Sequence, residues 1–538
     1  MLPDISDYDK LSERFRWNIP ARFNIGVAVS DVWAKAEPDR PAILDLRGGE
    51  AVETITFGDF AERSNRLASA LGALGLKHGD RVAILLPQMA EVVIAHTAIY
   101  KLGAVALPLA SLFGVDALEY RLADAAVRAV ITDASGVAKL AAIRPQLPGL
   151  QFVISTDGAD GDALGFQQLI EKGRPDFVAA DTSPDDPAMM IYTSGTTGPP
   201  KGALHGHRVL LGHLPGVQFP HEGFPKPGDR FWTPADWAWA GGLLNVLLPS
   251  LYFGVCVVAR RFDRFDPEAA LQLMSAHQVR NAFIPPTALR MLRSNHSAGR
   301  RYNVDLRTLA SGGESLGAPI YAWGREAFGL TINEFYGQTE CNLVLASCHA
   351  MGVSRAGSIG KAVPGHVCDV IRPDGSRCEP DEPGQIAVLR PDPVMFLGYW
   401  NRPDATRAKF IGDWMTTGDQ GRRDSDGYVF FFGRDDDVIT SSGYRIGPGE
   451  IEDCLLRHPA VEIAAAVGKP DAIRGEIVKA FIVLKSGFEP SADLSADIQA
   501  FVRTRLSAHE YPREVAFIDR LPLTTSGKVI RRQLREQG

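Results

Sequence analysis

The sequence predicts an α/β protein, with a large N-terminal domain of helices layered on parallel strands, a β-rich subdomain and a small α+β domain at the end. The first observation is a βαβ unit, formed by an apolar strand at 81–86, a helix at 90–102 and a strand at 104–107. Parallel strands need a crossover helix, and parallel sheets are covered on both faces. The second is that short strands separated by Gly, Pro and Asp turns dominate past about residue 365. The third is a charged stretch at 433–437, followed by a compact pattern of about 100 residues, which is enough for a small domain.

The same alternation of helix and strand extends through the N-terminal part. Thr56 stands before a periodic apolar pattern that reaches about residue 74, as an N-cap residue does. Apolar periodicity predicts further helices at 27–36, 117–125, 267–277, 287–292 and 318–328, and strands at 42–46, 129–132, 188–191, 280–284, 308–311 and 331–335.

Later segments are shorter and separated by turns. Predicted strands in the β-rich region are 385–389 and 428–432. In the last part we expect strands at 438–439, 461–467, 478–484 and 514–518, one helix that begins at Pro448 and one at 494–506. We place the boundary so that the domains cover 1–435 and 436–538.

Composition excludes several classes of protein. Hydrophobic residues make up 45% of the chain and charged residues 22%, which is ordinary for a globular protein. The net charge of −7 comes without a basic stripe, so we expect no nucleic-acid partner. The six cysteines form no CxxC pair and no signal-peptide core opens the chain, so we expect reduced thiols and a cytoplasmic location. The apolar run 243–259 is broken by Asn245, Pro249 and Gly254, which favours buried core over a membrane span.

A loop rich in glycine and hydroxyl residues follows the strand at 188–191. It reads Tyr-Thr-Ser-Gly-Thr-Thr-Gly-Pro-Pro-Lys-Gly over 192–202. Its glycines permit tight turns, and its hydroxyls, backbone N–H groups and Lys201 could surround an anion. It is not a Walker A loop, because Gly202 stands where Ser or Thr would bind magnesium. The loop is either a polar surface turn or a phosphate site, and a phosphate chain fits its chemistry better than other common ligands.

Two later segments carry side chains suited to a nucleotide. In the segment 334–340, Tyr336 offers a flat face for a base, Thr339 a hydroxyl for a phosphate and Glu340 a hard oxygen ligand for magnesium. Asp419 follows a tight turn at 416–418, and a carboxylate is the usual partner of ribose hydroxyls. Taken separately, each segment also fits an ordinary solvated turn.

Together these motifs resemble those of the adenylate-forming superfamily, which includes acyl-CoA synthetases, firefly luciferases and the adenylation domains of peptide synthetases. The matching segments occur in the superfamily's order over nearly the whole chain. They are 192–202, Ser-Gly-Gly-Glu-Ser at 311–315, 334–340, 416–419, Ser-Ser-Gly-Tyr-Arg-Ile at 441–446 and Pro-Leu-Thr-Thr-Ser-Gly-Lys at 522–528. The resemblance is greatest to the medium-chain acyl-CoA synthetase branch.

The resemblance implies an ATP site and a catalytic group of three residues, Lys528, Glu340 and Thr339, in which Glu340 binds Mg²⁺. Tyr336 would stack on adenine, Asp419 would bind the ribose hydroxyls, and Arg434 would contact ribose or phosphate. The ATP- and AMP-binding residues implied by the resemblance are Thr193, Ser194, Gly195, Thr196, Thr197, Lys201, Gly313, Glu314, Ser315, Glu334, Phe335, Tyr336, Gly337, Gln338, Thr339, Asp419, Arg434, Arg445 and Lys528.

The resemblance also implies two half-reactions. Lys528 would bind the carboxylate and the α-phosphate, where an ammonium stabilises the charge that accumulates in the transition state. The small domain would then rotate about the hinge residue Asp436 and present Ser442, Gly443 and Tyr444 to coenzyme A. Acetylation of Lys528 would remove its charge, so a lysine acetyltransferase or deacetylase is a candidate partner.

The predicted acid is a short- or medium-chain or branched aliphatic carboxylate. Acetyl-CoA synthetases carry a tryptophan at the position of Gly337, so we expect a deeper acyl pocket here, with Trp237 and Gly241 in its wall. Cys341 and Asn342 depart from the small residues of many relatives. The alternatives are a benzoate-like acid, an enzyme that loads a carrier protein, and a nucleotide-binding regulatory protein without turnover; retention of Lys528, Glu340 and Asp419 argues against the last.

Overall fold

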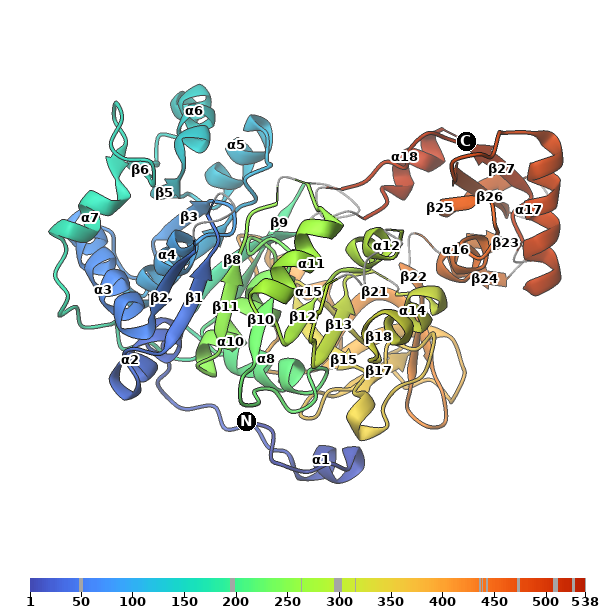
Figure 1. Cartoon of the computed structure of the whole chain (residues 1–538), viewed down its shortest axis with the longest axis horizontal. Coiled ribbons are helices and arrows are strands. Elements are labelled where there is room, and N and C mark those ends of the chain that lie inside the picture. The colour runs from blue at the N-terminus through green and yellow to red at the C-terminus, as the bar shows by residue number, and fades with distance from the viewer. Residues whose placement is uncertain are drawn as a thin grey trace.

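The N-terminal part of the chain is built on two large sheets and a smaller antiparallel one (Figure 1). The computed structural model describes residues 1–47, 52–193, 199–262, 264–294, 302–314, 316–434, 437, 439–441, 444–471, 475–506, 511–524 and 528–537. It confirms the predicted α/β class with a small C-terminal sheet domain.

One large sheet has eight strands and contains the predicted βαβ unit. Residues 81–85, 105–108, 129–132 and 152–155 pair in parallel, as predicted for the first three. In spatial order the strands are β19 (Gly398–Tyr399), β9 (Lys201–Gly206), β8 (Pro187–Thr193), β4 (Val105–Pro108), β3 (Arg81–Leu85), β5 (Ala129–Thr132), β6 (Phe152–Ser155) and β7 (Leu164–Gly165). Helices of this region are α3 (Phe57–Ala73), α4 (Ala90–Lys101), α5 (Val115–Asp124), α6 (Ala134–Ile143), η2 (Arg144–Gln146) and α7 (Phe166–Lys172). Thr56 caps α3 as predicted, and Asp59 completes a capping box with it.

The other large sheet has nine strands. Their order is β16 (Lys361–Ala362), β15 (Cys341–Ala346), β14 (Asn333–Gln338), β13 (Thr308–Gly312), β12 (Asn281–Phe283), β10 (Arg230–Trp232), β11 (Cys256–Ala259), β1 (Pro41–Asp45) and β2 (Glu53–Thr56). The helices that connect its later strands are α11 (Pro267–Ala276), α12 (Pro286–Ser294) and α14 (Ala318–Phe328).

Neither large sheet is wholly parallel, although both contain the predicted parallel strands. The pairs β8–β9, β14–β15 and β1–β2 are antiparallel. In the β14–β15 pair only Thr339 and Glu340 connect the strands, and a connection that short can only make a hairpin. Two of these antiparallel connections are predicted site segments. The phosphate loop connects β8 to β9, and the end of the segment 334–340 connects β14 to β15.

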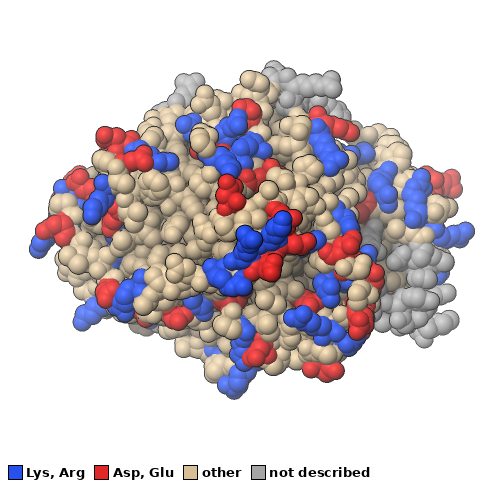
Figure 2. All heavy atoms as spheres, turned by 90° about the horizontal axis from the view of Figure 1, so that it is seen from below, with Lys and Arg blue, Asp and Glu red and all other residues tan. Residues whose placement is uncertain are grey.

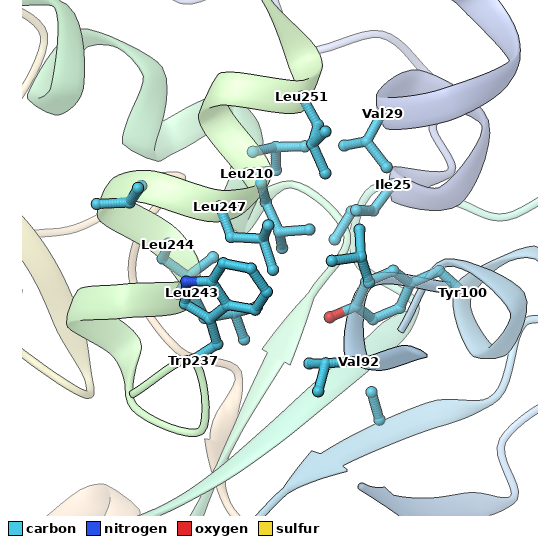
Figure 3. Packing of buried hydrophobic residues seen from close by; sticks show 14 of the residues in the cluster. Ile25, Val29, Val92, Tyr100, Leu210, Trp237, Leu243, Leu244, Leu247 and Leu251 are labelled. Atoms are coloured by element: carbon cyan, nitrogen blue, oxygen red, sulfur yellow. The ribbon is translucent and has the colours of Figure 1, made fainter. Parts of the chain in front are cut away.

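The main core lies where helices from both halves of this region meet. Figure 3 shows side chains of α4, of α8 (Val209–Gln218) and of the segment 237–251 pointing toward Ile25 and Val29. The predicted helix 27–36 is a π-helical turn, η1 (Val27–Asp31), followed by α2 (Val32–Ala36). The short helix α1 (Tyr8–Arg14) precedes them.

The run 243–259 is buried, as predicted. It follows α9 (Ala240–Gly242) and forms the continuation of that helix, η3 (Leu243–Leu247), then α10 (Leu248–Tyr252) and β11. Within the described ranges, none of the helices combines the length and the apolar character needed to cross a bilayer. All six cysteines are free thiols. On the face shown in Figure 2, side chains of both charge signs are interspersed.

The β-rich region forms an antiparallel sheet, which confirms the predicted change in pattern. Its strands are β17 (Cys368–Ile371), β18 (Gly384–Leu389), β21 (Trp414–Arg423), β20 (Phe410–Ile411) and β22 (Val429–Arg434), with η4 (His349–Met351) and α15 (Pro403–Arg407) outside the sheet. Asp419 of β21 is directly opposite Arg434 of β22.

The C-terminal domain has its own sheet and its own apolar core (Figure 1). Its elements are β23 (Ile439–Ser441), β24 (Tyr444–Ile446), α16 (Pro448–Leu455), β25 (Val461–Asp471), β26 (Gly475–Leu484), α17 (Ala492–Arg505), β27 (Glu514–Phe517) and α18 (Arg531–Glu536). β25 and β26 are longer than predicted because their antiparallel ladder continues to the pair Asp471 and Gly475. The predicted boundary residues 435 and 436 lie outside the described residues, so the exact boundary stays a prediction.

Candidate active site

The β14–β15 hairpin brings most of the predicted nucleotide residues together. The strand expected at 331–335 lies at 333–338 in the structure, so residues 334–338 of the segment 334–340 belong to β14 itself. The strand is extended because β14 has a second neighbour. Its pairing with β13 ends at Phe335, opposite Gly312, but its pairing with β15 continues to Gln338, opposite Cys341. Only Thr339 and Glu340 form the turn. The structure thus places Tyr336 and Glu340 near the same end of one hairpin.

Asp419 is the centre of the first polar cluster. It is 4% exposed, and it accepts hydrogen bonds from the Tyr336 hydroxyl and from Gln338 Nε2, the latter at 2.7 Å. The guanidinium Nε of Arg434 lies 3.5 Å from Asp419 Oδ1. Burial raises the pKa of Asp419, while Arg434 and the two hydrogen-bond donors act in the opposite direction.

This cluster fits a ribose. Asp419 Oδ1 accepts no hydrogen bond in the part of the chain that the structure describes. A buried carboxylate oxygen without a donor is costly, and a ribose hydroxyl would satisfy it. Tyr336, Gln338, Asp419 and Arg434 are thereby brought together as the sequence predicted, and their roles toward a nucleotide stay predictions.

Glu340 is the centre of the second cluster. It is 7% exposed and accepts a hydrogen bond from the Tyr399 hydroxyl, while the ammonium of Lys201 lies 5.1 Å from the centre of the Tyr399 ring. The short strand β19 carries Tyr399 to this place by pairing with β9. The backbone carbonyl of Glu340 also accepts from Phe396 N at 2.9 Å.

The second cluster suits a magnesium ion bound with a triphosphate. Mg²⁺ is usually held by one or two carboxylates together with phosphates and waters, and Glu340 and the Thr339 hydroxyl supply hard oxygens here. Tyr399 was missed by the sequence analysis, because its partner Glu340 is 59 residues away and no spacing links them. The aromatic pair Tyr399 and Trp400 directly after Gly398 was the available signal.

The predicted phosphate loop connects β8 to β9. Thr193 and Lys201 pair with each other at the base of this hairpin, and the Pro200 carbonyl accepts from the Tyr120 hydroxyl at 2.9 Å. Ser194, Gly195, Thr196 and Thr197 lie outside the described residues. The strand expected at 188–191 is confirmed and continues to Thr193.

The segment after β13 lies beside the hairpin. Gly313 has a φ of +95° with open space where a β-carbon would be, and the Glu314 carboxylate accepts from Thr287 Oγ1 at 2.9 Å and pairs with Arg290 at 3.1 Å. Ser315 lies outside the described residues. Phe335 is buried against Phe283, with ring centres 5.0 Å apart, so its side chain belongs to the core.

Glu334 carries a carboxyl group that is buried. Its side chain accepts from Leu316 N at 3.1 Å, and burial raises its pKa to about 8, with a smaller contribution from the nearby carboxylate of Asp453. Asp453 belongs to α16, and its Oδ1 lies 2.7 Å from the position of a β-carbon at Gly317. This end of α16 therefore packs against the N-terminal part beside Glu334.

The residues predicted for the acyl pocket are closely packed. Trp237 is 1% exposed and lies among the core leucines of Figure 3. A β-carbon at Gly241 would be 3.2 Å from the Phe283 ring. At Gly337 a β-carbon would lie 2.1 Å from Leu343 N and 2.7 Å from Asn342 Cα, so any side chain there needs β15 to move. Their assignment to an acyl pocket stays a prediction.

Lys528 lies in the C-terminal domain on an exposed turn. Its backbone N–H donates to Thr524 Oγ1 at 3.0 Å. Among the described residues, no hydrogen bond or ion pair of its ammonium reaches the hairpin clusters. Asp436, Ser442 and Gly443 lie outside the described residues, as do the side chains of Tyr444 and Arg445, whose backbone forms β24.

Helix α18 connects the Lys528 turn to the start of the C-terminal domain. Arg531 donates from Nη2 to both oxygens of Glu452, at 2.6 and 2.8 Å, and its Nη1 lies 3.9 Å from Asp437. Arg535 donates to Asp437 at 2.8 Å. The sequence analysis missed these contacts, because the arginines and their partners are about 80 to 100 residues apart and a basic helix ordinarily indicates a solvated face.

Comparison with known proteins supports this arrangement. The AMP-binding enzyme family matches residues 30–400, and the AMP-binding enzyme C-terminal domain matches residues 450–528. The chain is 34% identical over 536 residues to the mitochondrial acyl-coenzyme A synthetase ACSM5 of Homo sapiens, covering 96% of this chain and 91% of that protein.

Two solved structures have the same fold over nearly their full length. One is the anthranilate CoA ligase AuaEII in complex with anthranoyl-AMP, with a TM-score of 0.89, 28% identity and coverage of 96% of this chain and 98% of that one. The other is a benzoate CoA ligase from Burkholderia xenovorans LB400, with a TM-score of 0.84, 28% identity and coverage of 95% and 100%. By its sequence and its fold, the chain belongs to the AMP-binding enzyme family.

Proposed function

We propose that the protein is an ATP-dependent acid–CoA ligase that forms an acyl-adenylate and then an acyl-CoA thioester, releasing pyrophosphate and AMP. The observation that carries the proposal is the hairpin that holds two buried carboxylate clusters. Asp419, with Tyr336, is suited to the nucleoside, and Glu340, beside Lys201, is suited to the phosphate end. The acyl-CoA synthetase and the two CoA ligases among the similar proteins support this activity.

In the first half-reaction the carboxylate of the acid attacks the α-phosphorus of ATP, and pyrophosphate leaves. No nucleophile from the protein is needed, because the protein contributes positioning and electrostatic stabilisation. Lys528 would stabilise the carboxylate and the charge on the α-phosphate, and Thr339 would donate to a phosphate oxygen. A Mg²⁺ ion held by Glu340 would neutralise charge on the triphosphate.

In the second half-reaction the thiol of coenzyme A attacks the acyl carbon, and AMP leaves. The C-terminal domain, proposed to begin at residue 436, would rotate about Asp436, withdraw Lys528 and bring residues 442–444 to the thiol. The separate apolar cores of the two domains support such a rotation. We also propose that the protein is located in the cytoplasm and that acetylation of Lys528 regulates it, as the sequence predicted.

The proposed acid is a short- or medium-chain or branched aliphatic carboxylate. The similarity to a family of acyl-coenzyme A synthetases supports an aliphatic acid. An aromatic acid is the second candidate, because the two similar structures are ligases of anthranilate and benzoate, and Trp237 could stack on an aromatic ring.

The test is AMP and acyl-CoA formation with ATP, Mg²⁺ and CoA across acetate, butyrate, isobutyrate, hexanoate, octanoate and benzoate. We expect turnover to peak at four to eight carbons. A peak at benzoate would select the aromatic alternative, and AMP release without a CoA thioester would indicate an enzyme that loads a carrier protein. Absence of any acid-dependent AMP formation would overturn the proposal.

A further inference from the structure

A buried pair of amides lies between the predicted acyl-pocket wall and the nucleotide hairpin. Asn342 Nδ2 donates to Asn245 Oδ1 at 2.5 Å, and the two residues are 7% and 2% exposed. Asn342 is the second residue of β15, and Asn245 lies in the middle of η3. The neighbours of Asn245 in η3 are all fully buried leucines and a valine, so the pair is polar in apolar surroundings.

The pair adjoins the residues on which the proposed chemistry depends. A β-carbon at Gly337 would lie 2.7 Å from Asn342 Cα, so Asn342 is immediately beside the strand segment that carries Tyr336 and Gln338. Asn245 follows Gly241 by four residues, about one helical turn, so the two lie on the same side of that helix. The amide pair therefore lies between the two structures that would enclose the acyl chain.

The pair is joined by a single hydrogen bond, which leaves one whole NH₂ group and one whole amide oxygen unused. The reciprocal bond, from Asn245 Nδ2 to Asn342 Oδ1, is not formed, and neither side chain has another hydrogen-bond partner in the described part of the chain. What remains is one amide NH₂ group and one amide oxygen. The same remainder results if oxygen and nitrogen are exchanged in both amides. Neither of these two atoms is among the fully enclosed polar atoms without a partner, so each keeps a small accessible surface, and a group that both donates and accepts would satisfy both.

We propose that Asn245 and Asn342 determine specificity for an acid that carries a hydroxyl group on its chain, an inference that rests on the proposed function. The hydroxyl would donate to Asn342 Oδ1 and accept from Asn245 Nδ2. A carbonyl substituent accepts only and would leave the Asn342 oxygen unsatisfied. A plain alkyl chain would leave both groups unsatisfied. A site built to bind a hydroxyl rejects the analogue that lacks it far more strongly than an apolar pocket discriminates by size.

The experiment compares hexanoate with its 2-, 3-, 4-, 5- and 6-hydroxy derivatives and with 5-oxohexanoate. Adenylation is followed as acid-dependent exchange of pyrophosphate into ATP, and thioester formation as acyl-CoA. For the unaltered protein, we expect kcat/KM for at least one hydroxy acid to exceed that for hexanoate by about tenfold or more. Preference for hexanoate over every hydroxy isomer would overturn the inference and leave the ligase assignment intact.

The variant Asn245→Leu/Asn342→Leu replaces both amides by side chains of similar size, so no single amide is left unpaired. We expect the ratio of hydroxy acid to hexanoate to fall at least tenfold in this variant. Asn342→Ala serves as a second variant, in which the ratio of hydroxy acid to hexanoate should also fall. The control is Cys341→Ala, which is adjacent on β15 but buried in a different apolar cluster, and it should leave the ratio unchanged. An unchanged ratio in the leucine variant would contradict the proposal.

A binding measurement separates this inference from the proposed function. If no acid supports adenylation, the ligase assignment fails, and thermal stabilisation by the hydroxy acids still decides the role of the amides. Greater stabilisation of the unaltered protein than of the leucine variant would support the inference, and equal stabilisation would overturn it.

Discussion

At the scale of single residues, Glu334 couples the stability of the site to pH. Its pKa is about 8 in the folded protein because of burial, against an ordinary value of 4.5. Between these values the folded state holds a proton that the unfolded state has released, so stability decreases as pH rises through this window. Glu334→Gln has no such proton to lose. Between pH 5 and pH 8 we therefore expect the difference in the free energy of unfolding between the variant and the unaltered protein to shift in favour of the variant by about 2–4 kcal/mol. Urea denaturation at both pH values measures it, and parallel pH profiles would contradict it.

Gly337 is required for the close approach of β14 and β15. A β-carbon there would lie 2.1 Å from Leu343 N, and Leu343 itself has a φ of +58°, an unfavourable value for a leucine. We expect Gly337→Ala to destabilise the protein by about 1–3 kcal/mol, as overpacking does. The control is Gly149→Ala, where a β-carbon meets no atom within 4 Å, with an expected change within about 0.5 kcal/mol. Equal stabilities of the two variants in urea denaturation would show that β15 yields freely.

Lys528 is exposed, so its removal should affect chemistry more than folding. We expect Lys528→Ala to lose adenylation, by about 100-fold or more, because no other side chain is assigned to the carboxylate and the α-phosphate together, where the charge accumulates. Thioester formation from a supplied acyl-adenylate should be largely preserved. Pyrophosphate exchange and CoA acylation measure the two half-reactions separately, and equal loss of both would refute the assignment of Lys528 to adenylation.

At the scale of secondary-structure elements, helix α18 connects the Lys528 turn with α16 and with Asp437, next to the proposed hinge. Arg531→Met would leave Glu452 without its bidentate partner, so we expect the free energy of unfolding of the C-terminal domain to fall by about 3 kcal/mol. We also expect adenylation to slow, because the Lys528 turn loses its anchor. The matched control is Arg532→Met, whose exposed side chain pairs only with Glu536, 3.2 Å away, among the described residues; it should change stability by less than about 0.5 kcal/mol. Denaturation and pyrophosphate exchange of both variants make the comparison, and similar losses in the two would show that α18 is no anchor.

At the scale of the whole molecule, the two domains have separate cores. No apolar cluster among the described residues contains members from both sides of residues 434–437. We therefore expect a fragment of residues 1–436 to fold and to be stabilised by ATP in a thermal-shift measurement, but to lack adenylation because Lys528 is missing. A fragment that aggregates or does not respond to ATP would show that the C-terminal domain is part of the folding unit.

The sequence by itself determined the features that depend on local patterns. Periodic apolar residues located most helices and strands, Thr56 formed the predicted N-cap, and the change in pattern past residue 365 located the β-rich sheet. Of the candidate site, the sequence identified Tyr336, Asp419 and Glu340, because short motifs carry their order and chemistry.

Only the tertiary structure decided which distant side chains meet. Tyr399 contacts Glu340 across 59 residues, Asn342 contacts Asn245 across 97, and Arg531 contacts Glu452 across 79. Strand β14 likewise extends through Gln338 because β15 folds back on it. The physical reason is the same in each case. These bonds depend on strand pairing and helix packing between segments far apart in the chain, and the periodicity of a single segment contains no information about its partner.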